Sequence, residues 1–489
     1  MNSNLTLHFK KPFNIGEISN PDASGSSGGT NYPEYIKLTV KIDKNIISDI
    51  KFKAFGCNYT IAAASYLTTL IKNRDILKST LITGKELEKY LGKFPAAKKY
   101  VLDIVINALN NLISDYISKP HTRNIYKKNP RRIAVAMSGG IDSSMTTRFL
   151  KNDGWEVIGV TMKLLPDDFY QKNNTKICCS LNDIETARKV SLKLDIPHIV
   201  INFVSPFEEN IIDPFCMEYQ KGRTPNPCVE CNKYIKFGAL LEKIKTLGAS
   251  YLATGHYCRV EKSPSSGLFE IRKGLDKSKD QSYVLWKLSQ DQLSMIKTPI
   301  GIFTKDYIKK ETGKIYPFLK NKSESQDICF IPENNYHSFL ASKLRKIKQG
   351  TILNTRGEII GTHKGYPFYT VGQRKGLGIS YSKPLYVKEI IPEKNIIIAG
   401  EEKDILQRSL KVKDLNFIAG SPPGGNFKSM VKIRYNFKET PAEIRIENKK
   451  TATVIFDTPQ KAVTPGQSAV FYIDDTLIGG GVIMKSSQS

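Results

Sequence analysis

A glycine turn between an apolar run and a polar helix start limits the fold of this chain more than any other feature. The apolar run is Ile133-Ala-Val-Ala-Met137, and the turn is Ser138-Gly139-Gly140. A short β-branched run predicts a buried strand, and the residues from Asp142 onward predict a helix. Glycines let the backbone approach a ligand, and a helix start presents N–H groups and a positive dipole end. The sequence therefore predicts a phosphate site here, with Asp142 as a candidate magnesium ligand.

The turn does not follow the P-loop pattern, because no Gly-x-x-x-x-Gly-Lys-Ser/Thr occurs in the chain. Residues 138–144 instead resemble the PP-loop of the ATP pyrophosphatases. That resemblance implies an enzyme that splits ATP between the α- and β-phosphates and leaves an adenylated substrate.

The composition favours a soluble protein with a polyanionic partner. The chain has 489 residues, enough for roughly three domains, and a formal net charge of +26. Such an excess favours nucleic acid, although an overall abundance of Lys, Asn and Ile is a second explanation. No apolar run is long enough to cross a bilayer, and the first residues lack a secretory core. We therefore expect a cytoplasmic protein with no membrane partner.

Changes of pattern along the chain indicate several domains. The first segment combines strands at 35–42 and 46–55 with later helices, and Ser24–Gly29 is expected to be a loop. Alternating strands and helices then indicate a doubly wound parallel α/β sheet, and short strands near the end indicate a small antiparallel barrel. The expected divisions are residues 1–120, a linker at 121–130, and domains at 131–333, 334–405 and 406–489.

The cysteines suggest a second reagent. Cys228-Val-Glu-Cys231 follows Gly222-Arg-Thr-Pro-Asn-Pro227, and a helix is expected to begin near Lys233. A thiol near a helix start and basic residues is available as thiolate. Cys329 follows much later in the chain, and two thiols across a pocket can pass sulfur as a persulfide.

Six motifs in one order extend the resemblance over residues 131–485. The chain resembles the tRNA-specific 2-thiouridylase (MnmA-type) family, within the PP-loop, adenine nucleotide alpha hydrolase-like class. This resemblance implies a PP-loop α/β domain, a small central domain and a β-barrel. It also implies ATP-dependent sulfur transfer to C2 of the wobble uridine, with a tRNA anticodon loop as partner. The motifs are Ala136–Ser144, Gly222–Pro227, Ala253–Tyr257, Lys279–Tyr283, Thr370–Gly378 and Thr464–Val470.

The resemblance also assigns residues. Cys231 is the expected nucleophile, and Cys329 is the expected persulfide carrier. The expected ATP contacts are Ala136, Met137, Ser138, Gly139, Gly140, Ile141, Asp142, Ser143, Met162 and Gly255. The expected contacts to the base and to tRNA are Asn226, Pro227, Cys228, Lys279, Asp280, Gln281, Arg434 and Tyr435, with His256 and Gln467 near the site.

Cys228 departs from the family pattern, because several members have an aspartate at this place. A proton-transfer role of that carboxylate is therefore in question here. Cys228, Cys231 and Cys329 form a candidate three-thiolate set for a 4Fe-4S cluster that would leave one iron open to sulfide. The persulfide route and the cluster route both stay open at this stage, and zinc is a third reading of the same thiols.

Residues 5–117 resemble the IscU/NifU-type iron–sulfur scaffold, an α+β fold. The scaffold holds its cluster through three cysteines, an aspartate and sometimes a histidine. Here Cys57 alone remains; Tyr32, Glu34 and Tyr100-Val101 fall at the other ligand positions. One thiolate does not hold a cluster. The unit is therefore a degenerate scaffold: a docking platform for a cysteine desulfurase with Cys57 as sulfur acceptor, or a folded remnant in which Cys57 is merely buried.

Two other functions compete with tRNA thiolation. One is another PP-loop adenylating synthetase, which leaves the cysteines unexplained. The other is an iron–sulfur or sulfur carrier acting through the N-terminal domain, against which the missing ligands argue. Structural roles are expected for Cys216, Cys258, His198 and His337.

Overall fold

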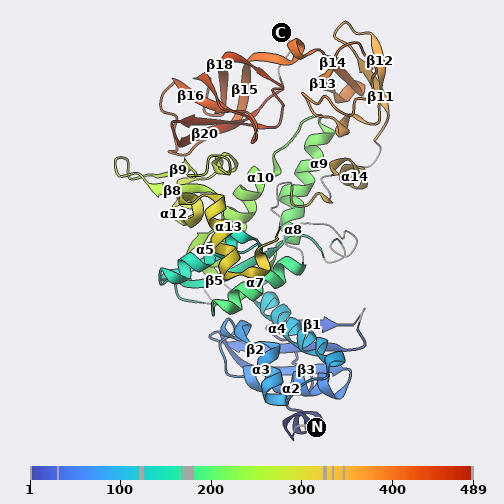
Figure 1. Ribbon diagram of the computed structural model, residues 1–489, viewed down its shortest axis with the longest axis vertical. Coiled ribbons are helices and arrows are strands. Elements are labelled where there is room, and N and C mark those ends of the chain that lie inside the picture. The colour runs from blue at the N-terminus through green and yellow to red at the C-terminus, as the bar shows by residue number, and fades with distance from the viewer. Residues whose placement is uncertain are drawn as a thin grey trace.

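The computed structural model describes residues 3–29, 32–119, 126–166, 169, 181–322, 328–332, 335–344 and 347–485. The molecule is elongated (Figure 1). The N-terminal unit lies at one end, a parallel-sheet domain lies in the middle, and two small β domains lie side by side at the other end.

The N-terminal unit is a three-stranded antiparallel sheet covered by helices. The sheet has the order β1-β2-β3. The two predicted strands and the predicted helices after them are confirmed. The elements are α1 Ser3–Lys10, β1 Ala23–Gly28, β2 Tyr35–Asp43, β3 Ile46–Phe55, α2 Asn58–Ile71, α3 Gly84–Leu91 and α4 Tyr100–Ser118.

The prediction of a loop at Ser24–Gly29 is wrong, because most of it forms the edge strand β1. The strand pairs with β2 from Ala23↔Val40 to Gly28↔Tyr35. A Cβ added at Gly25 would lie 2.1 Å from the backbone nitrogen of Leu112 in α4. The small residues therefore let α4 pack directly on this strand, a constraint that low complexity conceals.

The middle domain holds the predicted parallel sheet, in the order β10-β7-β4-β5-β6. Every pair in it is parallel. β4 begins two residues before the expected boundary at 131, and 121–125 of the expected linker lie outside the described residues. The strands are β4 Asn129–Ala136, β5 Glu156–Lys163, β6 His198–Asn202, β7 Ala249–Ala253 and β10 Ile296–Lys297.

Helices cover both faces of this sheet. The prediction that a helix begins near Lys233 is wrong: Asn226 caps the helix start, and the helix runs from Pro227 through a π-helical stretch. Proline suits the first helical position because it lacks an N–H. The helices are α5 Ile141–Asn152, α7 Leu181–Lys193, α8 Val204–Phe207, α9 Asp213–Gln220, α10 Pro227–Glu230, the π-helix Cys231–Ala239, α11 Leu240–Thr246, α12 Gln290–Ser294 and α13 Lys305–Ile315.

The last two domains are β-rich. The smaller one has α14 Tyr336–Lys343 and a four-stranded sheet of β11 Gly350–Leu353, β12 Ile359–His363, β13 Tyr386–Ile391 and β14 Ile396–Gly400. The other is the expected barrel, closed by pairing between β15 and β20. A hairpin of the middle domain, β8 Cys258–Lys262 and β9 Phe269–Lys273, extends the sheet through β20. The barrel strands are β15 Leu406–Phe417, β16 Asn426–Lys432, β17 Thr440–Ile446, β18 Thr451–Lys461, β19 Ser468–Ile473 and β20 Thr476–Ile483.

The N-terminal unit packs against the edge of the parallel sheet. Helix α4 lies on β6, and one apolar cluster includes both Leu109 of α4 and Ile199 of β6. The Arg188 guanidinium donates to Asn107 Oδ1 at 3.1 Å, and the Tyr126 hydroxyl donates to Asp75. The two units therefore share a core and a polar rim.

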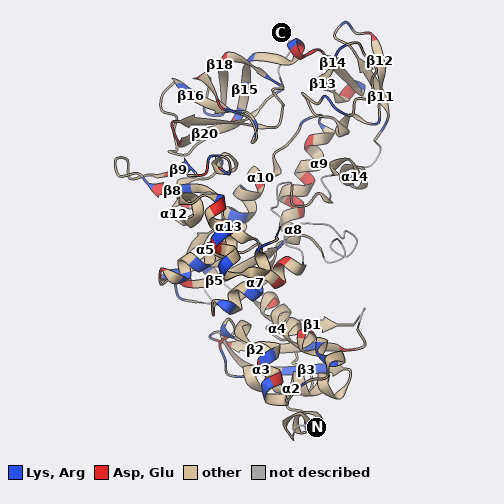
Figure 2. Cartoon of the chain, in the orientation of Figure 1, with Lys and Arg blue, Asp and Glu red and all other residues tan. Residues whose placement is uncertain are grey.

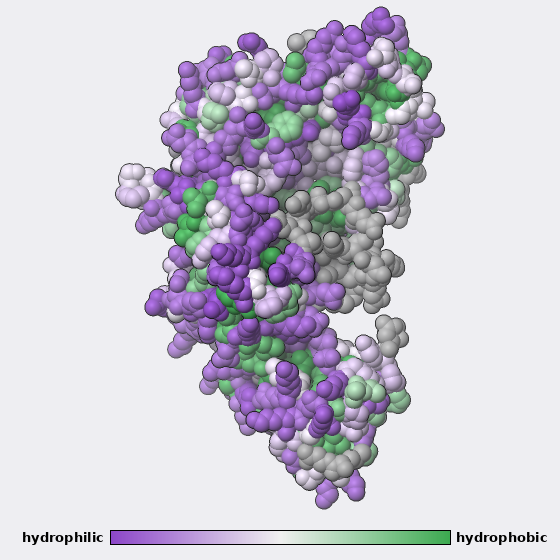
Figure 3. Space-filling view, viewed as in Figure 1, coloured by the Kyte–Doolittle hydropathy of each residue, from purple (hydrophilic) through white to green (hydrophobic). Residues whose placement is uncertain are grey.

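The surface carries its positive charge in every domain. Figure 2 shows Lys and Arg spread over all parts of the chain rather than gathered in one. The face seen in Figure 3 is mostly hydrophilic, with hydrophobic residues in small separate areas. Within the described ranges, no helix combines the length and apolar character needed to cross a bilayer.

Candidate functional site

The turn at 138–144 is shaped by a glycine that no other residue replaces easily. Gly139 has φ +67°, and an added Cβ would lie 2.3 Å from the carbonyl oxygen of Asp183. The Ser138 N–H donates to Ser143 Oγ at 3.3 Å, and the Ser144 hydroxyl donates to the Gly140 carbonyl at 2.7 Å. The turn thus leads directly into α5, whose first N–H groups form an anion-binding helix start.

Two further expected ATP contacts lie at the same edge of the sheet. Gly255 follows β7, and a Cβ there would lie 3.0 Å from Cβ of Asp142 and from the Ser143 nitrogen. Met162 lies near the carboxyl end of β5, with 7% of its surface exposed. In an open parallel sheet, ligands bind at the carboxyl ends of the strands.

Asp142 is engaged by Lys305 and by Tyr257, the last residue of the motif Ala253–Tyr257, and the sequence assigned neither of them a role. The Lys305 ammonium lies 2.8 and 2.7 Å from its two carboxylate oxygens, and the Tyr257 hydroxyl donates to it at 2.8 Å. Lys305 is 6% exposed, and Asp142 is 30% exposed. The carboxylate already has a fixed cation, so its role as magnesium ligand stays a prediction. Lys305 is 163 residues away in sequence, and no local motif marks it.

A hydrogen-bonded path joins the ATP loop to the N-terminal unit. The Thr161 hydroxyl donates to the Met137 carbonyl at 2.8 Å and lies 2.9 Å from Nε2 of His198. The His198 backbone N–H donates to Thr80 Oγ1 at 3.3 Å. Burial lowers the pKa of His198 to about 3, so the ring is neutral. Because Thr161 donates to Met137, Nε2 of His198 is the donor in their contact.

The three candidate thiols have different surroundings. Cys228 is exposed, Cys231 is 8% exposed, and Cys329 is half-buried. Next to Cys329, the Phe330 ring packs on Phe207 and Phe215. The described residues, which include all three cysteines, contain no group of three His, Cys, Asp or Glu side chains arranged to hold a metal ion. The structure therefore shows no preformed cluster site at these thiols, and the cluster route stays a prediction.

The loop before Cys228 is held by the barrel. The Gln467 amide donates to the carbonyls of Thr224 and Pro225, both at 3.0 Å. The Thr224 N–H donates to the Pro465 carbonyl at 2.9 Å. The Asn226 side chain accepts from the Val229 N–H at 3.4 Å, which fixes the start of α10. Gln467 and Asn226, which are expected to lie near the base, thus hold the loop before Cys228 in place.

The turn after β16 faces Cys228. Arg434 is half-buried and donates to the Val371 carbonyl at 2.8 Å and to Thr464. The next residue, Tyr435, is 38% exposed, and its ring centroid lies 6.0 Å from that of Tyr283. Burial, with the charges of Asp280 and Cys228, raises the pKa of Tyr435 to about 12.

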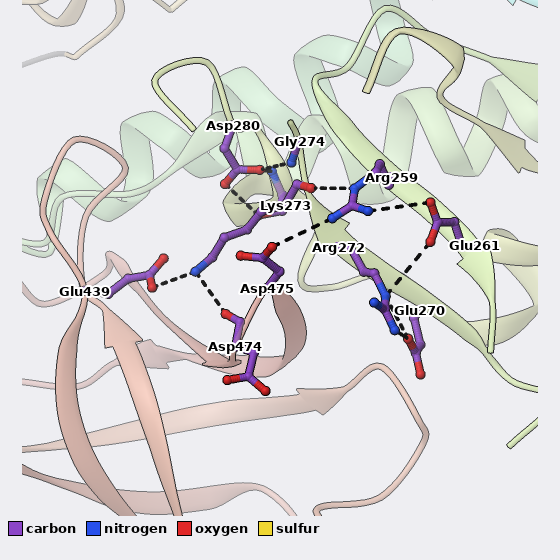
Figure 4. A network of polar contacts seen from close by, with 11 residues as sticks. Arg259, Glu261, Glu270, Arg272, Lys273, Gly274, Asp280, Glu439, Asp474 and Asp475 are labelled. Carbon is purple, nitrogen blue, oxygen red and sulfur yellow. Dashed lines mark hydrogen bonds and ion pairs between the residues drawn. The ribbon is translucent and has the colours of Figure 1, made fainter. Parts of the chain in front are cut away.

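The loop 279–281 is organised by a buried carboxylate. Asp280 accepts from the Gly274 N–H at 3.0 Å and from the Ser282 hydroxyl at 2.8 Å, and burial raises its pKa (Figure 4). The Gln281 side chain accepts from the Tyr257 N–H at 3.0 Å. Asp280 is only 8% exposed. The buried Asp280 carboxylate therefore shapes the loop, and direct tRNA contact by Lys279, Asp280 and Gln281 stays a prediction.

His256 is buried beside the π-helix Cys231–Ala239. Its Nδ1 lies 2.7 Å from the Thr254 hydroxyl, and its ring centroid lies 5.8 Å from that of Phe237. Burial lowers its pKa, which keeps the ring neutral.

In the N-terminal unit, Cys57 stands at the start of α2. The thiol is half-buried and lies 3.5 Å from the Thr60 hydroxyl. The Cys57 thiol is therefore partly accessible, whereas the remnant interpretation describes a buried thiol.

Four known protein families match successive parts of the chain. Residues 131–333 match the tRNA methyl transferase HUP domain, and residues 337–401 match the tRNA methyl transferase PRC-barrel domain. Residues 407–483 match the aminomethyltransferase β-barrel domain, and residues 2–123 match the NifU-like N terminal domain.

Curated relatives match the chain behind the N-terminal unit. The chain is 44% identical over 357 residues to the tRNA-specific 2-thiouridylase MnmA of Carboxydothermus hydrogenoformans, covering 73% of this chain and 98% of the relative. It is 46% identical over 356 residues to tRNA-specific 2-thiouridylase MnmA 1 of Caldanaerobacter subterraneus, covering 72% and 98%. A solved iron–sulfur cluster assembly scaffold protein from Fervidobacterium islandicum is 15% identical, with a TM-score of 0.21, over 23% of this chain and 96% of that one. The chain belongs to the family of tRNA-specific 2-thiouridylases, which are tRNA-uridine 2-sulfurtransferases, and carries a NifU-like domain ahead of the family's three domains.

Proposed function

We propose that this enzyme adenylates O2 of the wobble uracil with ATP and then replaces the activated oxygen by sulfur carried on its own thiols. The observation that carries the proposal is the turn at 138–144, which leads into α5 at the carboxyl edge of the parallel sheet. Family membership supports the substrate class, and the geometry supports the order of events.

The chain's residues act on ATP by position and charge. Backbone N–H groups at the start of α5 are proposed to face the phosphates, and Gly139 and Gly255 keep the approach free of side chains. The Lys305–Asp142 pair lies at the start of α5, with the ammonium beneath the carboxylate. Attack of uracil O2 on the α-phosphorus releases pyrophosphate and makes the C2 oxygen part of a good leaving group.

The thiols then complete the exchange. A persulfide on Cys329 attacks C2 and expels AMP, and the base is then joined to Cys329 through two sulfurs. The Cys231 thiolate attacks the sulfur of Cys329, so the base leaves with the terminal sulfur and a Cys231–Cys329 disulfide forms. For the next turnover, either an external thiol reduces that disulfide and a persulfide donor reloads Cys329, or HS⁻ attacks the Cys329 sulfur of the disulfide. The second route reforms the Cys329 persulfide and releases the Cys231 thiolate.

The sulfur step is assigned to the thiols alone. Cys228, Cys231 and Cys329 differ in exposure and do not form a three-ligand group among the described residues. Cys228 instead lies near Tyr435 at the junction with the barrel. There it lines the entry for the base together with Asn226 and Pro227.

The tRNA contacts proposed are the solvent-facing groups of this junction. Tyr435 presents a partly exposed ring beside Tyr283, and the Lys432 ammonium lies 5.5 Å from the Tyr435 centroid. A base turned out of an anticodon loop finds an aromatic face and a cation here. Lys279 and Gln281 are proposed to contact the loop's backbone.

The sulfur donor is proposed to be a cysteine desulfurase that docks on the N-terminal unit. Cys57 is half-buried rather than enclosed, which suits a sulfur acceptor. With Cys57→Ala, thiolation driven by a desulfurase should fall, whereas thiolation driven by inorganic sulfide should not. Unchanged desulfurase-driven thiolation would contradict the acceptor role.

The test of the function itself is the 2-thiouridine content of tRNA after the enzyme, oxidised to its Cys231–Cys329 disulfide, is incubated with ATP and sulfide. We expect AMP and thiouridine in equal amounts, with AMP formation dependent on tRNA. AMP formation without tRNA would instead favour another adenylating synthetase.

A further inference from the structure

The residues at the ligand positions of the NifU-like domain lie together as one cluster. The rings of Tyr32 and Tyr100 stack, with centroids 5.4 Å apart and 19° between their planes. The Tyr100 hydroxyl donates to Glu34 Oε2 at 2.7 Å. A Cβ added at Gly56 would lie 2.7 Å from Cγ of Glu34, so the turn before Cys57 packs directly on this side chain. The ligand positions have therefore kept their places and changed their chemistry.

A lysine completes the cluster. The Lys98 ammonium lies 3.0 Å from Glu34 Oε1 and 3.3 Å from the Tyr100 hydroxyl oxygen. The Glu34 side chain is 2% exposed and the Lys98 side chain is 34% exposed, so the ammonium closes the cluster on its solvent side. Burial by itself would raise the pKa of Glu34, but hydrogen bonds from Tyr100, Lys98 and Cys57 outweigh it and lower that pKa.

We propose that the N-terminal unit holds neither a metal ion nor an iron–sulfur cluster, because the Lys98 ammonium supplies the positive charge at this site and is bound by Glu34 and Tyr100.

The donor set argues against a metal in three ways. Cys57 is the one thiol of the cluster, whereas structural zinc and clusters take several thiolate or imidazole ligands. The two stacked rings fill the positions from which two further ligands would reach. A cation at Glu34 would have to displace Lys98 from a nearly inaccessible carboxylate. In keeping with this, no metal-holding group occurs in the portion of the chain that the structure describes.

The charge of Lys98 has a function of its own. An unpaired buried carboxylate destabilises a fold strongly, because it loses hydration without compensation. In a metal-dependent scaffold the buried carboxylate is neutralised only when the metal is bound, whereas the Lys98 ammonium neutralises Glu34 at all times. The proposal does not depend on the sulfur-acceptor role of Cys57, but it leaves that thiol uncommitted to a metal.

The first experiment measures bound cobalt in the whole chain. Wild type and Cys57→Ser are incubated with Co²⁺, desalted and compared by metal content and by thiolate-to-cobalt absorption. The catalytic cysteines contribute equally to both, so the difference reports the N-terminal unit. We expect no difference. One additional equivalent in wild type, with a thiolate band that Cys57→Ser abolishes, would overturn the proposal.

The second experiment tests the charge. Lys98→Met is compared with Lys99→Met, a change at an adjacent exposed lysine, and with Lys98→Arg, which keeps the charge. Hydrogen exchange of β2 and α2 amides should be at least about tenfold faster in Lys98→Met. Exchange in Lys99→Met and Lys98→Arg should stay close to wild type. Equal exchange in Lys98→Met and Lys99→Met would show that the ammonium is not needed, and would refute the proposal.

Discussion

Two regions of this enzyme contain the same three groups, a carboxylate, a lysine and a tyrosine, in opposite arrangements. At the ATP loop, Asp142 accepts from Tyr257 at 2.8 Å and pairs with Lys305 at 2.7 Å. In the N-terminal unit, Glu34 accepts from Tyr100 at 2.7 Å and pairs with Lys98 at 3.0 Å. The lysine is the buried partner in the first region, and the carboxylate is the buried partner in the second.

The difference in exposure separates a working site from a closed one. At the ATP loop the ammonium lies beneath the carboxylate, so the outer face stays open to a ligand. In the N-terminal unit the ammonium covers the carboxylate, and the tyrosine rings fill the rest. The same chemistry thus supports ligand binding in one domain and internal neutralisation in the other.

The largest expected effect concerns the thiol that acts with the open, ATP-binding region. Cys231→Ser should lower sulfide-driven thiolation by at least about 100-fold, because a hydroxyl is a far weaker nucleophile at neutral pH. The assay is 2-thiouridine in tRNA. Cys216→Ala is the control, since burial raises the pKa of that thiol to about 11 and makes it inert. Substantial activity of Cys231→Ser would show that this thiol is not the nucleophile of the sulfur step.

The next effect tests the open arrangement. Lys305→Met should raise the KM for ATP by about 10- to 100-fold, because an unpaired Asp142 carboxylate would repel the phosphates. Lys310→Met, an exposed change on the same helix, is the control. AMP formation at varied ATP measures the effect. A lower kcat at constant KM would instead place Lys305 outside ATP binding.

The closed arrangement predicts an acid dependence. Because the pKa of Glu34 is lowered in the folded state, its pairing stabilises the unit above the usual glutamate value of 4.5. This contribution is lost as pH falls from that value through the lowered pKa. The protection factors of α2 amides, which correct for the pH dependence of intrinsic exchange, should fall less steeply in Glu34→Gln as pH goes from 6 to 3 (an interval of about 3 units). Parallel pH profiles would contradict a buried carboxylate that depends on its charge.

The smallest effect concerns the path between the regions. His198→Phe removes the donor to Thr161 and should raise the KM for ATP about 3-fold, the cost of one neutral hydrogen bond. His198→Asn, which keeps an N–H donor, should recover part of this. Since the pKa of His198 is lowered to about 3, its protonation should add no inflection to the KM profile near neutral pH. Equal KM values for Phe and Asn variants would show that the ring acts by packing alone.

The sequence predicted the parallel sheet and the ATP loop because both are encoded locally. The run Ile133–Met137 and the glycines after it fix a strand and a turn within a few residues of each other. The helix start at Pro227 was also encoded, by Asn226 and the proline, but the apolar periodicity after Lys233 obscured it. Family resemblance located the thiols, and it did not reveal their different surroundings.

Lys305 and Lys98 were not predicted, because their roles depend on distant partners. Lys98 is 64 residues from Glu34, and Lys305 is 163 residues from Asp142. A lysine at a helix start is usually a solvated surface residue, so nothing local separates these two from many others. The strand at Ala23–Gly28 was missed for the same reason, since only α4 explains its small residues.

The hairpin β8–β9 has a consequence for how the enzyme can be divided. The hairpin belongs to the parallel-sheet domain, but β9 pairs with β20 of the barrel. In addition, Gln467 of the barrel holds the loop before Cys228. A fragment cut before the barrel would keep the hairpin as an isolated two-stranded ribbon and lose the support of its thiol loop. Gene fragments that separate ATP chemistry from the barrel should therefore yield protein that is insoluble or inactive. The parallel-sheet domain and the barrel therefore depend on each other structurally.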